Sequence, residues 1–182
     1  MTDFRGYLPD LDELDLVQNP ALGAFALWTF TMAYQSRNAR QASLPLAFLV
    51  LPLVLHEEAR SHISSTRLDS GLAVFVAKLS EQRENLLAIH KRALQLRALT
   101  MESVTVARGA KLLSLDHKTA RLCALAAHEQ LRSPRLPERI KWLEPCSQKL
   151  GHWFAAMNDE HVARTLRVDY CVPPANLHEL TI

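Results

Sequence analysis

Two apolar blocks dominate the first third of the chain and predict its central helices. The first block, residues 19–34, reads NPALGAFALWTFTMAY, and its apolar side chains surround a helix instead of marking one stripe. A helix that is apolar on every side must be buried on every side, so we expect this one at the centre of the core. Asn19 is a good N-cap, and Pro20 suits the first helical position, where its missing N–H costs nothing.

The second block, residues 44–55, reads LPLAFLVLPLVL and predicts another buried helix. Ser43 is its candidate cap, and Pro52 predicts a kink or a break near Phe48 to Val50. A helix rises about 1.5 Å per residue and needs about 20 apolar residues to cross a bilayer core, so the block is too short to span a membrane. We therefore expect no contact with a membrane.

The first residues of the chain bear on its location. Met1 is followed by Thr2 and Asp3, whereas a signal peptide begins with basic residues ahead of an apolar run. A cytoplasmic protein is the resulting prediction.

Two further helices are expected in the middle of the chain. The stretch from Ser80 to Leu99 contains no Gly or Pro, and its apolar spacing predicts an amphipathic helix of about four to five turns. Thr100 is the expected N-cap of the next helix, which runs through Ala110 and loosens at Gly109.

A β-hairpin is predicted directly after these helices. Residues 112–115 and 120–125 have the short apolar pattern of strands, and the polar residues 116–119 between them form a turn. Helix, short turn, helix and hairpin is the order of a winged helix-turn-helix unit. The predicted fold is thus mainly α, a helical core with a winged helix-turn-helix-like unit at about 83–125 that carries a small β-hairpin.

The last third predicts two more helices. Residues 138–157 are strongly patterned, and Pro145 is expected to separate the first turn from the rest. Asn158 caps a final helix, with Asp159 and Glu160 in the first turn, where the helix dipole favours acids.

The ends of the chain differ from its body. Residues 1–18 contain five acidic side chains and one arginine, which predicts an acidic N-terminal arm. Residues 171–182 include two adjacent prolines and predict an extended tail. Between them, residues 19–170 are expected to form a single mainly helical domain.

Charge and cysteine content exclude some classes of protein. The 182 residues hold 21 basic and 19 acidic side chains, and this balance does not predict nucleic-acid binding. Cys123, Cys146 and Cys171 stand more than twenty residues apart, which excludes the close pairs of metal knuckles. We expect reduced, structural thiols.

The search for catalytic motifs gives a negative expectation. His56-Glu57-Glu58-Ala59-Arg60 begins like a zinc-protease helix, but that motif needs a second histidine where Arg60 stands. His62 lies six residues after His56 and cannot share one helix face with it. The sequence has no nucleophile elbow and no Walker motif, so we expect no catalytic residues, metal, cofactor or enzymatic activity.

Basic residues on the expected wing leave a choice between partners. Arg108, Lys111, Lys118 and Arg121 are candidates to contact either nucleic acid or a partner protein. A winged-helix DNA-binding regulator is therefore kept as an alternative, beside a winged helix that binds protein.

A family resemblance follows from the two apolar blocks and the residues behind them. The residues that carry it are Asn19, Pro20, Trp28, Tyr34, Leu44, Pro45, Phe48, Pro52, His56 and the run Ser70-Gly71-Leu72. With these residues the chain resembles the middle component of bacterial three-component ABC systems, which are antiphage conflict modules.

The resemblance implies a non-catalytic adaptor subunit. Its implied partners are an ABC-type ATPase and a third component of the same operon, which the adaptor would link in antiphage defence. Contact with DNA through the complex and a homodimer remain open. By analogy with the kite subunits of chromosome-maintenance complexes, a winged helix would bind the partner chain.

Overall fold

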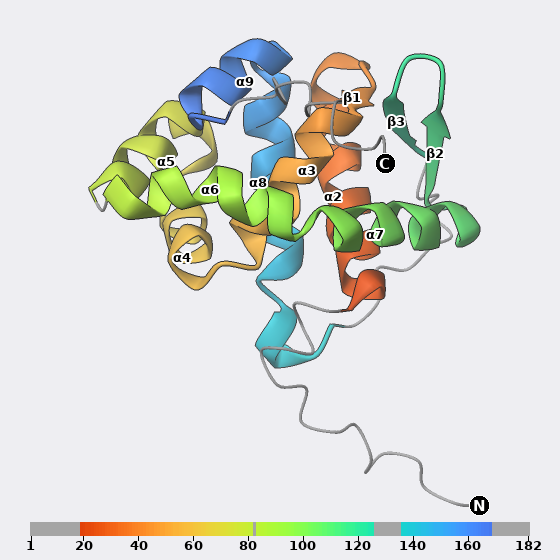
Figure 1. Ribbon diagram of the computed structural model, residues 1–182, viewed down its shortest axis with the longest axis horizontal. Helices are drawn as coiled ribbons and strands as arrows, with labels where there is room; N and C mark the ends of the chain where they lie inside the picture. The colour runs from red at the N-terminus through yellow and green to blue at the C-terminus, as the bar shows by residue number, and fades with distance from the viewer. Residues whose placement is uncertain (1–18, 82, 126–135, 169–182) are drawn as a thin grey trace, which may run out of the picture.

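The computed structural model of the chain describes residues 19–81, 83–125 and 136–168 (Figure 1). The predicted acidic arm at 1–18 and the extended tail at 171–182 lie outside these residues. Most of the described chain is helical, in the α-helices α2 (Pro20–Asn38), α3 (Leu44–Val54), α4 (Glu57–Ser65), α5 (Gly71–Ser80), α6 (Arg83–Gln95), α7 (Arg97–Gly109), α8 (Leu143–Ala155) and α9 (Asp159–Thr165), and the short 3-10 helices η1 (Leu68–Ser70) and η2 (Glu138–Ile140).

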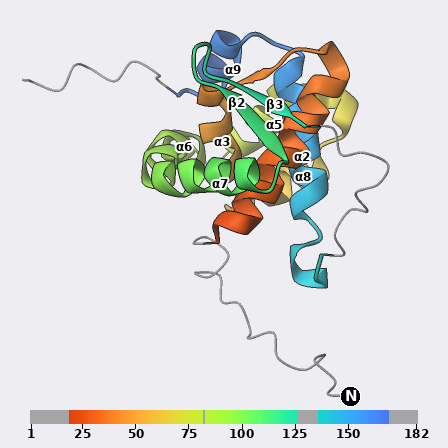
Figure 2. The same ribbon diagram turned by 90° about the vertical axis from the view of Figure 1, so that its right-hand side faces the viewer.

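Helix α2 is the centre of the core, as predicted. Asn19 Oδ1 accepts hydrogen bonds from the backbone N–H of Ala21 at 3.0 Å and of Leu22 at 3.3 Å, and Pro20 is the first helical residue. Residues 23–31 are all buried. The helix packs mainly against α8 and α7, and α2 and α8 run side by side in both views (Figures 1 and 2).

Close packing of α2 on α8 depends on a glycine. A Cβ atom added at Gly151 would lie 2.8 Å from the Cβ of Ala33 and 3.0 Å from the backbone N of Tyr34, and closer still to the carbonyl oxygen of Phe30. These distances leave no room for a side chain, so the two helix backbones approach each other at this position.

Helix α3 differs from its prediction at both points where the sequence indicated a special residue. The helix is continuous over residues 44–54, because Pro52 lies in its last turn and the chain leaves the helix soon afterwards. Of the predicted kink or break near Phe48 to Val50, the break is therefore wrong, and the kink stays a prediction. Ser43 precedes the helix but makes no capping bond, and its buried Oγ has no hydrogen-bond partner.

The boundary between α6 and α7 was also predicted wrongly. Helix α6 ends at Gln95 and α7 begins at Arg97, so Leu96 alone joins them. Thr100 does not cap a helix: it is buried inside α7, where its hydroxyl donates to the Leu96 carbonyl at 2.9 Å. A threonine inside a helix can satisfy its hydroxyl in this way, by a hydrogen bond to the carbonyl four residues earlier.

The predicted winged helix-turn-helix arrangement over about 83–125 is not confirmed. A helix-turn-helix has three or four residues between its helices, whereas one residue joins α6 to α7. The two helices follow one another across the molecule in Figure 1. The mainly α fold class and the small β-hairpin are confirmed.

The hairpin belongs to a three-stranded antiparallel sheet. Strands β2 (Leu113–Asp116) and β3 (Arg121–Ala124) form the predicted hairpin, and β1 (Ala42–Ser43) pairs with the other edge of β3. The strand order is β1-β3-β2. Strand β1, which the sequence did not predict, thus brings the end of α2 next to the hairpin.

The C-terminal helices agree with the sequence in outline. The predicted helix at 138–157 is divided into η2 and α8 by Lys141 and Trp142, while Pro145 lies in the first turn of α8, where proline is tolerated. Asn158 caps α9 as predicted, because its Oδ1 accepts the His161 N–H at 2.7 Å.

Two findings bear on the membrane and thiol predictions. Across residues 19–81, 83–125 and 136–168, no helix has both the length and the apolar character needed to cross a membrane. Cys123 and Cys146 are free thiols, and Cys171 lies outside the described residues.

Candidate functional site

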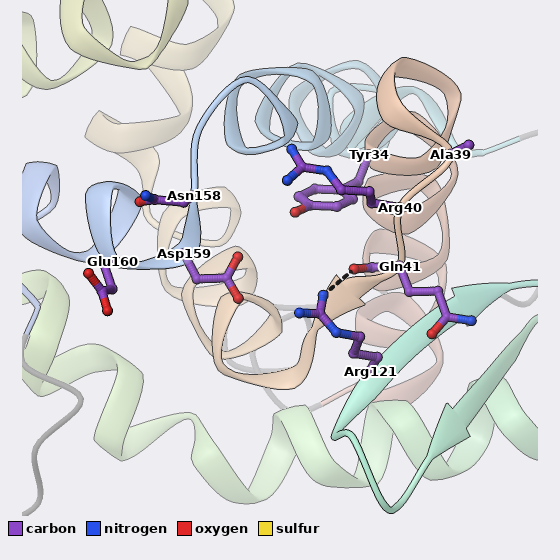
Figure 3. Close-up of a pocket in the computed structure, with 8 residues that line it drawn as sticks. All are labelled: Tyr34, Ala39, Arg40, Gln41, Arg121, Asn158, Asp159 and Glu160. Atoms are coloured by element: carbon purple, nitrogen blue, oxygen red, sulfur yellow. Dashed lines mark hydrogen bonds between the residues drawn. The ribbon is translucent and has the colours of Figure 1, made fainter.

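A cleft lined by charged residues lies between the end of α2, strand β3 and the start of α9 (Figure 3). Its volume is about 720 Å³. We call it the charged cleft, and its lining residues are Tyr34, Ala39, Arg40, Gln41, Arg121, Asn158, Asp159 and Glu160.

Local backbone structure places these residues together. Helix α2 ends at Asn38, and its C-cap Ala39 adopts a left-handed conformation with φ 51° and turns the chain towards β1. Arg40 and Gln41 follow in this turn. In the sheet, Ser43 of β1 pairs with Arg121 of β3, so the hairpin brings Arg121 to the same place. Asp159 comes from the start of α9, on the opposite side of the cleft (Figure 3).

Tyr34 lies at the base of the charged cleft. Its side chain is only 2% exposed, its ring packs on Phe30 with centroids 6.1 Å apart, and its hydroxyl points into the cleft (Figure 3). Within the described part of the chain this hydroxyl makes no hydrogen bond, and it is open to the cleft. Burial raises the pKa of Tyr34, the negative charge of Asp159 raises it further, and Arg40 and Arg121 act in the opposite direction. The hydroxyl is therefore a neutral donor.

The two arginines of the cleft are each held by one backbone carbonyl. Arg40 Nη2 donates to the Ala155 oxygen at 3.2 Å, and Arg121 Nη1 donates to the Gln41 oxygen at 2.9 Å. A guanidinium has five N–H donors, so both side chains are positioned and keep donors for a ligand.

The carboxylate opposite Arg121 in the hairpin already accepts hydrogen bonds from other residues. Asp116 lies directly opposite Arg121 in the β2–β3 ladder. Its Oδ1 accepts the Lys118 N–H at 2.9 Å and its Oδ2 accepts the Thr119 hydroxyl at 2.6 Å, and these bonds lower the pKa of Asp116. Asp116 therefore stabilises the turn of the hairpin, and the Arg121 side chain lines the cleft instead of pairing with Asp116.

The carboxylates of the cleft differ in direction. Asp159 is half-buried and turns towards Arg121 and Tyr34, whereas Glu160 is exposed and points away (Figure 3). Neither Arg40 nor Arg121 comes within ion-pair distance of a carboxylate among the residues that the structure describes. The cleft thus holds positive groups on one side and a negative group on the other, without direct contact between them.

The four basic residues predicted from the sequence are separated by the hairpin. Arg108 lies in the last turn of α7 and Lys111 precedes β2, while Lys118 lies in the hairpin turn and Arg121 begins β3. The length of β2 puts about 10 Å between these two ends. All four side chains are exposed, and of them Arg121 lines the charged cleft. Nothing in the described residues favours the DNA-binding alternative.

The sequence alone did not indicate Tyr34, Arg40 and Asp159 as a site. In the sequence, Tyr34 belongs to an apolar block, and Asp159 stands in the first turn of an expected helix. The signal that could have drawn attention to Tyr34 is its hydroxyl at the end of a helix that is otherwise buried on all sides.

A metal role is not supported by the arrangement of ligand residues. No group of three His, Cys, Asp or Glu side chains across residues 19–81, 83–125 and 136–168 could hold a metal ion. His56 instead caps α4, because its Nδ1 accepts the Ala59 N–H at 3.3 Å.

The family of the chain follows from its sequence over almost all of these elements. Residues 9–170 match the family model described as ABC-three component (ABC-3C) system Middle Component 3. The chain therefore belongs to the middle components of three-component ABC systems. Within that class it is a member of the Middle Component 3 family, which confirms the resemblance seen in the sequence. Neither a curated protein nor a solved structure gives a match.

Proposed function

We propose that this chain is a non-catalytic adaptor that links the ATPase of a three-component ABC system to the third component during antiphage defence in the cytoplasm. The observation that carries the proposal is the family match, because residues 9–170 include every described element and the family name makes the chain one of three components.

The groups in the charged cleft support binding to a partner protein. Tyr and Arg are enriched among the residues that contribute most to protein–protein affinity. The cleft places one buried tyrosine between two arginines whose positions are fixed by backbone carbonyls.

The order of elements supports a winged-helix relationship that differs from the predicted one. Helix α2, strand β1, helix α3, helix α7 and the β2–β3 hairpin follow the order of a winged helix, with α4, α5 and α6 inserted between α3 and α7. By analogy of fold, this arrangement would present the hairpin and the charged cleft to a partner chain.

A non-catalytic role agrees with the state of the buried thiol. Burial raises the pKa of Cys146, against smaller opposing effects of Ser64, Lys149 and Arg60. A thiol of this kind remains protonated at neutral pH and is a poor nucleophile. It serves packing between α8 and α4, where Ser64 Oγ lies 3.4 Å from its Sγ.

The proposal is tested by purifying the tagged chain from cells that express its native operon. The ATPase and the third component should both co-purify with it, in amounts that stay in constant ratio across a gel-filtration peak. An ABC ATPase from an unrelated system, expressed in the same cells, is the control and should not co-purify. Recovery of the chain without either component would contradict the proposal.

A further inference from the structure

The Tyr34 hydroxyl is the polar end of an otherwise buried side chain. The side chain is almost completely buried, yet its hydroxyl faces the charged cleft and makes no hydrogen bond with a described residue (Figure 3). A phenolic hydroxyl can both donate and accept a hydrogen bond. The hydroxyl is therefore available to a group that enters the cleft from outside the chain.

The donors around this hydroxyl select an acidic group. Arg40 and Arg121 flank the same space, and each has N–H groups beyond the one that its backbone carbonyl accepts. A guanidinium fork matches the two oxygens of a carboxylate, and a charge-assisted bond of this kind is stronger than a neutral one. The phenolic hydroxyl adds a third donor.

Asp159 restricts which acidic ligands fit. Its carboxylate faces the arginines across the cleft and would repel a polyanion that ran along it (Figure 3). An occupant that brings a basic group beside its carboxylate satisfies both sides. Charge complementarity thus favours a ligand with one charge of each sign.

The walls of the cleft favour a protein segment over a small molecule. Ala39, Gln41 and Asn158 are exposed, and Tyr34 is the buried member of the lining. Sites for small molecules enclose most of the ligand and are mainly apolar, whereas this cleft is open and charged. A partner chain that covers the opening would exclude water from the charges, and their interactions would then become stronger.

We infer that the charged cleft is the docking site for a segment of a partner protein in which a carboxylate side chain lies beside a basic one. The carboxylate binds between Arg40 and Arg121 and accepts the Tyr34 hydroxyl, and the basic group pairs with Asp159. The inference rests on the proposed adaptor function and names the surface that this function uses.

Two substitutions of opposite charge test the inference. The purified ATPase and the purified third component of the operon are each titrated with the wild-type chain, with Arg121→Gln and with Asp159→Asn, by isothermal titration calorimetry. For the component that docks here, each substitution should weaken binding by about tenfold or more, because each leaves one charge of the partner unpaired. Tyr34→Phe keeps the buried ring and should weaken binding by about fivefold.

Matched controls carry the same charge changes at exposed residues outside the lining of the cleft. Arg67→Gln and Glu81→Gln alter exposed residues beside η1 and at the end of α5, and neither residue lines the charged cleft. Both should bind within about twofold of the wild type, since exposed charges outside an interface contribute little.

The outcomes separate the inference from the proposed function. If the wild-type chain binds neither component, the adaptor function itself fails. If it binds and the cleft variants match their controls, the adaptor stands and the docking site is wrong. Affinity that falls for Arg121→Gln but rises for Asp159→Asn would also overturn the inference, because that is the response of a polyanionic ligand.

Discussion

The side-chain amide of Gln35 joins helix α2 to the last residue of strand β3. Gln35 Oε1 accepts a hydrogen bond from the Ala124 N–H at 2.6 Å, and Gln35 Nε2 donates to Cys123 Sγ at 3.3 Å. The two partners of the shorter bond are 89 residues apart in the sequence. This link fixes the hairpin, and with it Arg121, relative to Tyr34 in the same helix.

Removal of the Gln35 amide should loosen the hairpin. In Gln35→Leu the Ala124 N–H, in a residue that is 8% exposed, loses its acceptor. An unpaired buried donor costs about 1–3 kcal/mol, so the free energy of unfolding in urea should fall by about this amount. Hydrogen exchange at Ala124 should become faster.

Gln35→Glu is the control for this prediction, because it keeps a side-chain oxygen for Ala124 and loses only the weak donor to sulfur. It should be more stable than Gln35→Leu at neutral pH. Equal stability of the Leu variant and the wild type would show that the bond does not hold the hairpin.

Gly151 should not tolerate even a methyl group. An added Cβ would collide with the backbone of α2 at Phe30 and Tyr34, which cannot rotate away as a side chain can. Gly151→Ala should therefore lower the free energy of unfolding by about 1–3 kcal/mol or more. Chemical denaturation measures this directly.

Gly109→Ala is the matched control within helix α7. A Cβ atom there would meet nothing within 4 Å. Because alanine loses less backbone entropy than glycine on folding, this variant should be as stable as the wild type or gain up to about 1 kcal/mol. A Gly151→Ala protein that behaves in the same way would contradict the close contact of α2 and α8.

Acid should weaken the start of helix α4 through His56. The Nδ1 acceptor of this residue caps the helix, and burial lowers its pKa below the ordinary 6.5, with a further decrease from Arg92. Glu58 and Glu57 oppose this decrease and Arg60 adds to it. The unfolded chain therefore binds the proton more readily, so His56 stabilises the fold fully above pH 6.5 and loses this contribution as the pH falls below it.

His56→Asn separates the cap from the titration. Asparagine is a good N-cap and does not titrate in this range. Between about pH 7.5 and about pH 5.5 the wild type should lose more stability than His56→Asn, as measured by urea unfolding at each pH. Parallel losses in both proteins would assign the pH dependence to other groups.

Local signals explain the part of the fold that the sequence predicted. Asn19, Pro20 and Asn158 stabilise the first turn of the helix that each one begins. The apolar residues on every side of α2 predict its burial without information about which elements surround it. The hairpin was predicted for the same reason, since its strands adjoin its turn.

Long-range contacts explain the part that was missed. Strand β1 has two residues and exists because Ala42 pairs with Leu122, eighty positions further along. The helix boundary at Leu96 was missed because Thr100 has the side chain of a cap, and only its burial in the folded chain shows that it bonds to a preceding carbonyl.

The charged cleft also depends on long-range contacts, so the sequence alone did not predict it. Tyr34, Arg40, Arg121 and Asp159 come from three distant stretches of the chain and have no common motif. The sequence indicates Arg121 by its charge on the expected wing, and its place in the cleft follows from its pairing with Ser43. No spacing along the sequence connects these residues.

The most direct test of the adaptor role is the mass of the complexes that form when the purified ATPase and third component are mixed with and without this chain. Mass photometry should show a particle that contains both components only when the chain is present. If the two components associate equally well without it, the chain is not their link, and the proposed adaptor role is wrong.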